Sequence, residues 1–152
     1  MKQAQTVILK KTFYDQHVEH KEILANKDGR PYLSLIIEYN DKIFAIPFRT
    51  NIKHKYAFIF KTSTRKTDIS KGEPGIDYTK SVVIKETDIE RHCAINKNEW
   101  IEINKNLNTI TNNFMDYIKK FIASIATDDF KKLPVFKYSS LQYFIEDIKS
   151  IL

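Results

Sequence analysis

Two aliphatic segments joined by a pair of turn residues constrain the fold more than any other feature of this sequence. Residues 32–39 are rich in leucine and isoleucine, and residues 42–48 are apolar over most of their length. Asn40 and Asp41, which separate them, are typical of a tight hairpin connection. The pattern therefore predicts two antiparallel neighbouring strands.

Shorter apolar runs surround this hairpin. They predict strands at residues 7–9 and 56–60 and a buried strand at the end of residues 75–84. A helix is expected at residues 13–24, a polar surface loop at residues 62–75, and a short turn or helical piece at residues 88–92.

The apolar period changes to 3.6 residues after Asn104, which predicts a long amphipathic helix. Its expected buried stripe consists of Leu107, Ile110, Phe114, Ile118, Phe121 and Ile125. A last helix is expected after Ser139 and Ser140, which are good capping residues. With strands first and helices last, the chain is expected to be one α+β domain over residues 1–152, built on an antiparallel sheet.

The composition excludes several classes of protein. A hydrophobic content of 42% supplies enough material for a core and argues against a disordered chain. The single cysteine, Cys93, cannot form an internal disulfide, which is typical of a reducing compartment. The sequence has neither a membrane-length apolar run nor a secretory leader, so the cytoplasm is the expected location.

Positive charge is concentrated in one part of the chain. Residues 49–85 contain nine basic and three acidic residues, an excess equal to the net charge of +6 for the whole chain. Such a cluster suits phosphate groups, so we expect a nucleic acid as the partner.

The segment after the hairpin combines basic and hydroxyl side chains. Pro47 weakens pairing there, so the second strand is expected to open into a loop at Arg49. RNA is cleaved without metal when its 2′-hydroxyl attacks the adjacent phosphate, which requires a base, an acid and cations for the developing charge. The residues at positions 49–56 include the types that supply these groups.

Other candidate sites are weaker. His17 and His20 have helical spacing, but two ligands do not make a metal site. Cys93 follows His92, yet neither a helix N-terminus nor a third group that would activate its thiol is evident. The sequence also lacks a glycine-rich phosphate loop and the common hydrolase motifs. We therefore expect no metal and no cofactor.

Two segments resemble the toxins of type III toxin–antitoxin systems. The first is Arg-Pro-Tyr at residues 30–32, followed by the hairpin and by Phe-Ala-Ile-Pro-Phe-Arg-Thr-Asn-Ile-Lys-His at residues 44–54. The second is Gly-Ile-Asp-Tyr-Thr-Lys-Ser-Val-Val-Ile at residues 75–84. Together they resemble the ToxN/AbiQ group and more closely its TenpN branch, although only Thr50 keeps a hydroxyl where ToxN-like toxins carry a pair.

The resemblance implies a strongly bent antiparallel sheet with surrounding helices and a metal-independent endoribonuclease. It also implies a partner, an RNA antitoxin of repeated pseudoknots, which assembles with the toxin into a closed complex, and a role in phage defence by abortive infection. The expected catalytic residues are Thr50, Arg49, Asn51, Lys53, His54 and Lys80. The expected RNA-binding residues are Tyr32, Lys55, Tyr56, Lys61, Arg65, Lys66, Lys71 and Tyr78.

Two other interpretations remain open from the residues alone. A non-catalytic module that binds structured RNA would use the same positive window without an acid–base pair. A protein adaptor would instead dock a partner on the helical stripe, and its binding would be insensitive to salt.

Overall fold

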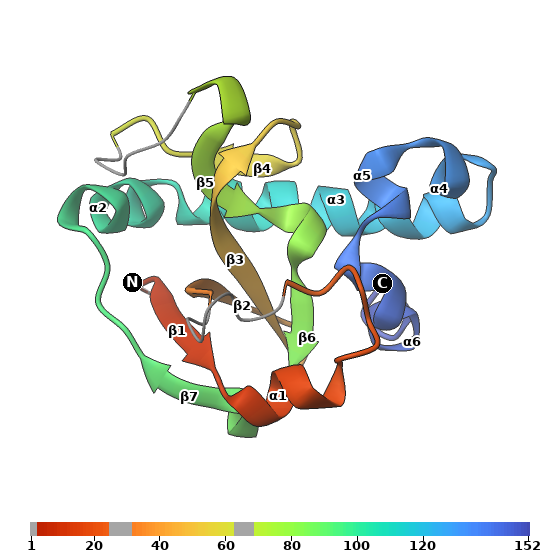
Figure 1. Cartoon of the computed structure of the whole chain (residues 1–152), viewed down its shortest axis with the longest axis horizontal. Helices are drawn as coiled ribbons and strands as arrows, with labels where there is room; N and C mark the ends of the chain where they lie inside the picture. Colours follow the sequence, from red (N-terminus) through yellow and green to blue (C-terminus); the bar gives the residue numbers. More distant parts are fainter. Residues whose placement is uncertain (1–2, 25–31, 63–68) are drawn as a thin grey trace.

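The computed structural model describes residues 3–24, 32–62 and 69–152 (Figure 1). Within this part of the chain, seven strands form one open antiparallel sheet and six α-helices surround it, so the predicted α+β class is confirmed. No helix among the described residues is both long enough and apolar enough to cross a membrane.

The sheet has the order β4-β5-β3-β2-β1-β7, and β6 also pairs with β3. The strands are β1 (Gln5–Leu9), β2 (Ser34–Tyr39), β3 (Lys42–Ile52), β4 (Ala57–Ile59), β5 (Glu73–Asp77), β6 (Val82–Ile84) and β7 (Ile89–His92).

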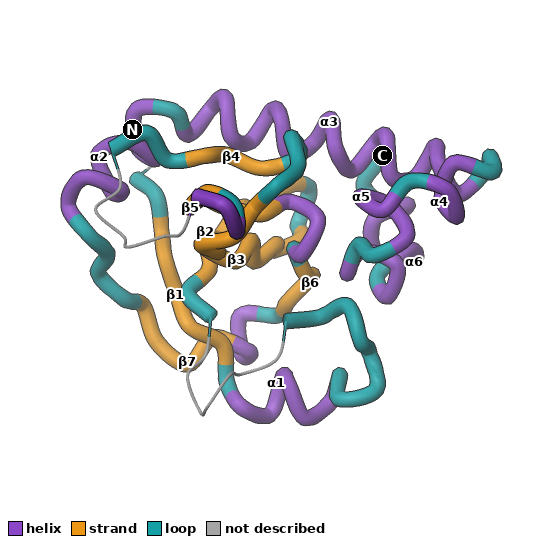
Figure 2. The backbone as a smooth tube through the Cα atoms, turned by 45° about the horizontal axis from the view of Figure 1, so that its top comes forward, coloured by secondary structure: helices purple, strands orange, loops and turns teal. Residues whose placement is uncertain are grey.

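The α-helices are α1 (Lys11–Gln16), α2 (Lys97–Lys105), α3 (Leu107–Ile125), α4 (Asp129–Lys132), α5 (Pro134–Lys137) and α6 (Ile145–Lys149). Short 3-10 turns occur at Ile69–Lys71, Tyr78–Lys80, Glu86–Asp88 and Ser140–Tyr143. Figure 2 shows α3 running along one side of the molecule, with α1 on the opposite side.

The hairpin of β2 and β3 is confirmed. Asn40 and Asp41 have φ values of 46° and 66°, the left-handed conformation that a two-residue turn needs at both positions. The register runs from Tyr39 opposite Lys42 to Ser34 opposite Pro47.

Pro47 does not end β3, and the prediction that the strand opens at Arg49 is wrong. The strand continues to Ile52 with an irregularity in its pairing to β5 after Arg49. The N–H of Phe48 donates to Leu33 on the β2 side, so the nitrogen of Pro47 faces the other edge, where β5 and β6 lie. This nitrogen carries no hydrogen, so Pro47 cannot donate a ladder bond to that edge.

The chain leaves that edge of β3 at the same place. Ile76 pairs with Phe48 and Val82 pairs with Ala45, so the five residues 77–81 stand opposite only residues 46–47. These residues include the 3-10 turn Tyr78–Lys80. The missing donor of Pro47 therefore coincides with a short excursion of the chain that carries Asp77, Thr79 and Lys80.

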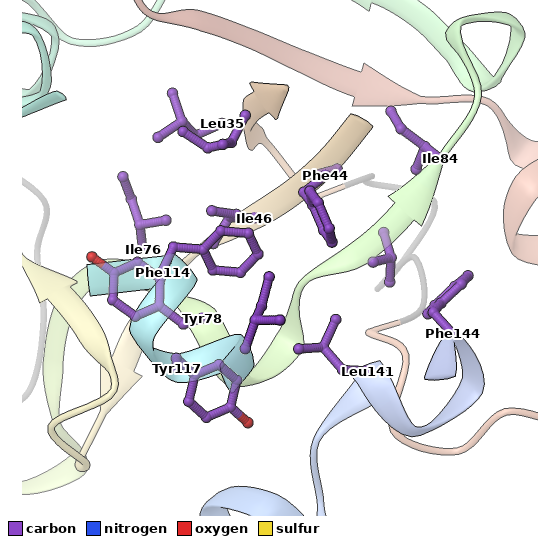
Figure 3. Close-up of a cluster of buried hydrophobic side chains, with 14 of the residues drawn as sticks. Leu35, Phe44, Ile46, Ile76, Tyr78, Ile84, Phe114, Tyr117, Leu141 and Phe144 are labelled. Carbon is purple, nitrogen blue, oxygen red and sulfur yellow. The ribbon is translucent and has the colours of Figure 1, made fainter. Parts of the chain in front are cut away.

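The stripe of α3 packs on one face of the sheet, as predicted. Ile110, Phe114, Ile118 and Phe121 are fully buried, while Leu107 and Ile125 lie at the margin of the core. The ring of Phe114 meets Phe44 of β3 edge to face at a centroid distance of 5.1 Å (Figure 3).

Two of the predicted local elements are wrong. The first helix ends at Gln16. The chain then continues in successive i→i+3 turns, in which the N–H groups of His17, His20 and Ile23 each donate to the carbonyl three residues earlier. Residues 89–92 form the edge strand β7 on β1 rather than a turn. This strand is almost entirely exposed, so it lacks the alternation that marks a strand in a sequence.

The C-terminal region is more broken than the sequence indicated. Ser139 does act as a cap, since its side chain accepts the N–H of Leu141. The segment that follows is a 3-10 turn and then α6, rather than one helix. The apolar residues of this region predict a buried face of Leu141, Phe144, Ile145, Ile148 and Ile151 or Leu152. Leu141, Phe144, Ile148 and Ile151 are buried, whereas Ile145 is only partly buried.

Candidate functional site

A fully buried carboxylate, that of Asp77, lies at the end of β5 and organises the candidate site. Its Oδ1 accepts the backbone N–H and the hydroxyl of Thr79 at 2.9 and 2.6 Å. The same oxygen lies 3.1 Å from Nε2 of His54, and Oδ2 accepts Nη1 of Arg49 at 2.9 Å. Donors from three segments of the chain therefore satisfy one buried anion.

The local sequence explains this geometry. Asp77 caps the turn Tyr78–Lys80 by accepting the N–H of Thr79 two residues later, a common role for aspartate. Arg49 reaches the same carboxylate from β3, where it pairs with Gly75. A Cβ on Gly75 would lie 2.2 Å from the carbonyl oxygen of Phe58, so only glycine permits the approach of β4 to β5 beside this site.

Both ring nitrogens of His54 have partners. Nδ1 accepts the backbone N–H of Tyr56 at 3.1 Å, so Nε2 carries the proton and donates it toward Asp77. Nε2 also lies 3.4 Å from the hydroxyl of Thr79. The side chains of His54 and Arg49 remain 25% and 23% exposed, so each connects the buried carboxylate to the surface.

These contacts keep Asp77 ionised. Burial by itself raises the pKa of a carboxyl group. Hydrogen bonds from His54, Thr79 and Arg49 outweigh burial and leave the pKa of Asp77 below its ordinary value of 3.8. The site therefore holds a fixed negative charge that orients the guanidinium of Arg49 and the imidazole of His54.

Lys80 follows directly in the same turn. Its ammonium donates to the carbonyl of Tyr138 at 2.7 Å and lies 3.4 Å from Oε1 of Glu22. Burial lowers the pKa of Lys80 below its ordinary value, and the nearby positive charge of Arg49 acts in the same direction, while Glu22 opposes both. An amine with a lowered pKa exchanges protons more readily near neutral pH.

Tyr32 lies near Lys80. Both side chains line a cavity of about 20 Å³ that is otherwise mostly apolar and includes Ala45 and Pro47 of β3. Ala45, Pro47 and Arg49 alternate with the residues that face α3, so they share the opposite face of the strand. Lys80, an expected catalytic residue, and Tyr32, an expected RNA-binding residue, therefore lie on the same face of the sheet.

Tyr56 extends the site toward α3 and α5. The ammonium groups of Lys55 and Lys120 lie 5.4 and 5.7 Å from the centroid of its ring. Its ring also packs against Tyr117 and Phe136 at 5.2 and 6.1 Å. An aromatic ring held between lysines suits stacking on a base whose phosphate is neutralised nearby.

The structure brings together only part of the predicted catalytic set. Arg49 and His54 meet at Asp77, and the charges of Asp77 and Arg49 act on the nearby Lys80. Thr50, Asn51 and Lys53 are exposed on or just after the last residues of β3. Gly72 packs against this stretch of backbone, since a Cβ on it would lie 2.4 Å from the carbonyl carbon of Asn51.

The predicted RNA-binding residues other than Tyr78 separate into three groups. Lys55, Lys61 and Lys71 are exposed, and Tyr32 and Tyr56 are partly buried. Arg65 and Lys66 lie outside the described residues.

Tyr78 lies in the core, which corrects its assignment to an RNA-binding surface. It is only 2% exposed and its ring packs 5.7 Å from that of Phe114 (Figure 3). A base cannot stack on a ring that is enclosed in this way.

Sequence reasoning assigned no role to Asp77, Thr79 or Glu22. The pattern Asp-x-Thr at residues 77–79 was a usable signal, because an aspartate two residues before a threonine is a common turn cap. Nothing local indicated that Arg49 and His54 would reach this aspartate.

The other weak candidates do not form a site within the described residues. There, no group of three or more metal-ligating side chains occurs. Nδ1 of His17 and Nδ1 of His20 lie 2.8 Å apart, and the ring of His20 stacks on Tyr143. These contacts fix the segment after α1 against the C-terminal region.

Comparisons with known proteins found no match for this chain. No family model, no curated protein and no solved structure matches it.

Proposed function

We propose that this protein is a metal-independent endoribonuclease. The observation that carries the proposal is the buried carboxylate of Asp77, which orients Arg49 and His54 at the surface beside Lys80. A fixed anion that orients a guanidinium and an imidazole, beside an amine of lowered pKa, is suited to transesterification of a phosphodiester.

In the proposed reaction, the 2′-oxygen of a ribose bonds to the adjacent phosphorus and gives its proton to a base. The bond from phosphorus to the 5′-oxygen breaks, and that oxygen takes a proton from an acid. The products are a 2′,3′-cyclic phosphate and a 5′-hydroxyl end, so no water and no metal are consumed.

The roles follow from the contacts. One edge of the Arg49 guanidinium is held by Asp77, and its remaining donors can bind the charged oxygens of the phosphorane. Lys80 and His54 share the two proton transfers, and Thr50 and Asn51 position the phosphate from the adjacent end of β3.

The wider biological proposal rests on the sequence resemblance. We infer a toxin of a type III system, with a ToxN/AbiQ-like bent sheet, inhibited by a pseudoknotted RNA antitoxin in a closed assembly and active in phage defence in the cytoplasm. The open antiparallel α+β sheet and the positive charge of residues 49–85 support this proposal.

The direct test is digestion of RNA by the purified protein in EDTA, followed by analysis of the ends. The expected result is cleavage with cyclic-phosphate termini. Arg49→Met, His54→Ala and Lys80→Met should each reduce the rate by about 10²- to 10⁴-fold, the usual contribution of a positioned acid or base. Lys85→Met removes an exposed lysine of the same region and should cleave like the parent protein.

A growth assay tests the toxin proposal separately. Expression of the chain without an antitoxin should arrest growth, and Thr50→Ala and His54→Ala should each relieve the arrest. Full toxicity in both variants would refute the site assignment. Short tandem repeats that precede a terminator just upstream of the gene would support the RNA antitoxin.

One observation favours a second candidate, a non-catalytic RNA-binding protein. Both nitrogens of His54 are engaged, so this ring transfers a proton only after it gives up the N–H of Tyr56 or the oxygen of Asp77. RNA binding that weakens steeply with salt, without cleavage in the EDTA assay, would select this alternative.

A further inference from the structure

A second cavity lies away from the Asp77 site, between the end of β7 and the start of α2. It has a volume of about 540 Å³, within the range of ligand pockets in proteins. Figure 1 shows the chain between β7 and α2 passing beside the start of β1. The lining consists of residues 4–6, residues 92–95, Lys97 and Trp100.

Hydrogen bonds hold the walls of this cavity in place. The N–H of Cys93 donates to the carbonyl of Thr6 at 2.8 Å. The side chain of Asn104 accepts the N–H of Ala4 and donates to the carbonyl of Trp100, both at 2.8 Å. These bonds join β1, the segment after β7 and α2, so the cavity is formed before any ligand binds.

The lining has a distinctive chemistry. Trp100 is 38% exposed although it is a large aromatic residue, and Lys97 and His92 are exposed beside the same cavity. None of its lining residues is acidic. An indole next to the ammonium of Lys97 suits a ligand that joins a flat aromatic ring to an anionic group.

We propose that this cavity binds a nucleotide, with the base stacked on Trp100 and the phosphate near Lys97 and His92. The nucleotide can be a free monophosphate or one unit of a single-stranded RNA, because both present the same base and phosphate. None of the residues of this cavity contributes to the Asp77 site, so the inference does not depend on the proposed cleavage.

The chain carries two intrinsic reporters of this cavity. Trp100 is its only tryptophan and Cys93 its only cysteine, and both line the cavity. Titration with AMP and with a short single-stranded oligoadenylate should quench the tryptophan fluorescence with saturation. The same ligands should slow the reaction of Cys93 with a thiol reagent over the same concentration range.

Variants assign the contacts. Lys97→Gln should weaken AMP binding, as read by tryptophan fluorescence, whereas Lys105→Gln, at the exposed far end of the same helix, should not. Trp100→Ala should weaken binding about 5- to 100-fold, the usual effect of losing a stacking partner, as read by protection of Cys93. Adenosine, which lacks the phosphate, should bind more weakly than AMP.

The outcomes separate clearly. Saturable quenching by AMP, by the RNA or by both supports the proposal and identifies the source of the nucleotide. An absence of quenching and of Cys93 protection with both ligands overturns it, as does equal binding of adenosine and AMP together with an unchanged Lys97→Gln variant. RNA cleavage is measured on the same samples, so a failure of the proposed nuclease activity is seen independently.

Discussion

Replacement of Asp77 by asparagine tests the site at its structural centre. The amide has nearly the same shape, so one oxygen can still accept the two donors of Thr79. The NH₂ group then stands where Oδ2 accepts Nη1 of Arg49, and two donors face each other. Arg49 and His54 also lose the only negative charge that this site supplies to them.

The magnitude follows from these contacts. Removal of one partner from a buried ion pair costs about 3–5 kcal/mol, and one hydrogen bond to a charged group contributes about 1.5–3 kcal/mol. Arg49 is 23% exposed, so water replaces part of what it loses. We expect Asp77→Asn to lower the free energy of unfolding by about 2–4 kcal/mol.

A matched control is available at the surface. Asp147 pairs with Lys42 at 3.2 Å, and the two side chains are 44% and 33% exposed. Asp147→Asn should cost between about 0 and 1 kcal/mol, as exposed ion pairs usually do. Urea unfolding of the three proteins at pH 7, with equal m-values, measures both changes. A loss in Asp77→Asn no larger than in Asp147→Asn would refute the reasoning.

The difference in stability between the parent protein and Asp77→Asn should depend on pH. The pKa of Asp77 is lowered in the folded state, so its ionised form stabilises the fold above the unfolded pKa. That contribution is lost as the pH falls through the folded pKa, which lies below 3.8. The difference in stability between the parent and Asp77→Asn should therefore persist at pH 5 and shrink only below about pH 4. A difference that has already disappeared at pH 5 would contradict the ionised, oriented carboxylate.

Two further predictions concern packing, and urea unfolding checks each of them. Gly75→Ala should destabilise the protein by about 3 kcal/mol or more, because the new Cβ would lie 2.2 Å from the carbonyl oxygen of Phe58; a change below 1 kcal/mol would contradict this close approach. Tyr78→Phe should be neutral or stabilising by up to about 1 kcal/mol, since its buried hydroxyl has no hydrogen-bond partner among the described residues. Tyr117→Phe should instead cost about 1–2 kcal/mol, because its hydroxyl donates to the carbonyl of Val135 at 2.6 Å, and equal effects of the two Tyr→Phe changes would refute the distinction.

The elements that were predictable from the sequence depend on local interactions. Asn40 and Asp41 favour the left-handed turn wherever they occur, and the stripe through Phe114 needs only a partner surface. The prediction of a helix over residues 13–24 was wrong, because the 3-residue repeat of successive turns and the 3.6-residue repeat of an α-helix barely differ over a few residues. Strand β7 could not be predicted, because its partner β1 lies at least 80 residues away along the chain.

The candidate site was also only partly predictable from the sequence. Residue type singled out Arg49 and His54, and the family resemblance added Lys80. The structure brings Arg49 and His54 together at Asp77, and Lys80 lies in the turn that Asp77 caps. Asp77 was not identified, because its importance comes from complete burial and from donors 23 and 28 residues away. Tyr78 was assigned to the surface, although the turn Tyr78–Lys80 directs its ring into the core.

The hairpin, the amphipathic helix and the positive charge of residues 49–85 each arise from neighbouring residues, so they could be predicted from the sequence. Only the folded chain selects the carboxylate that Arg49 and His54 share. That choice required β3 to run past Pro47 and the chain opposite this proline to leave the sheet edge, placing Asp77 beneath Arg49 and His54. Burial then forces the carboxylate of Asp77 to hydrogen-bond to the donors around it, since water does not reach it.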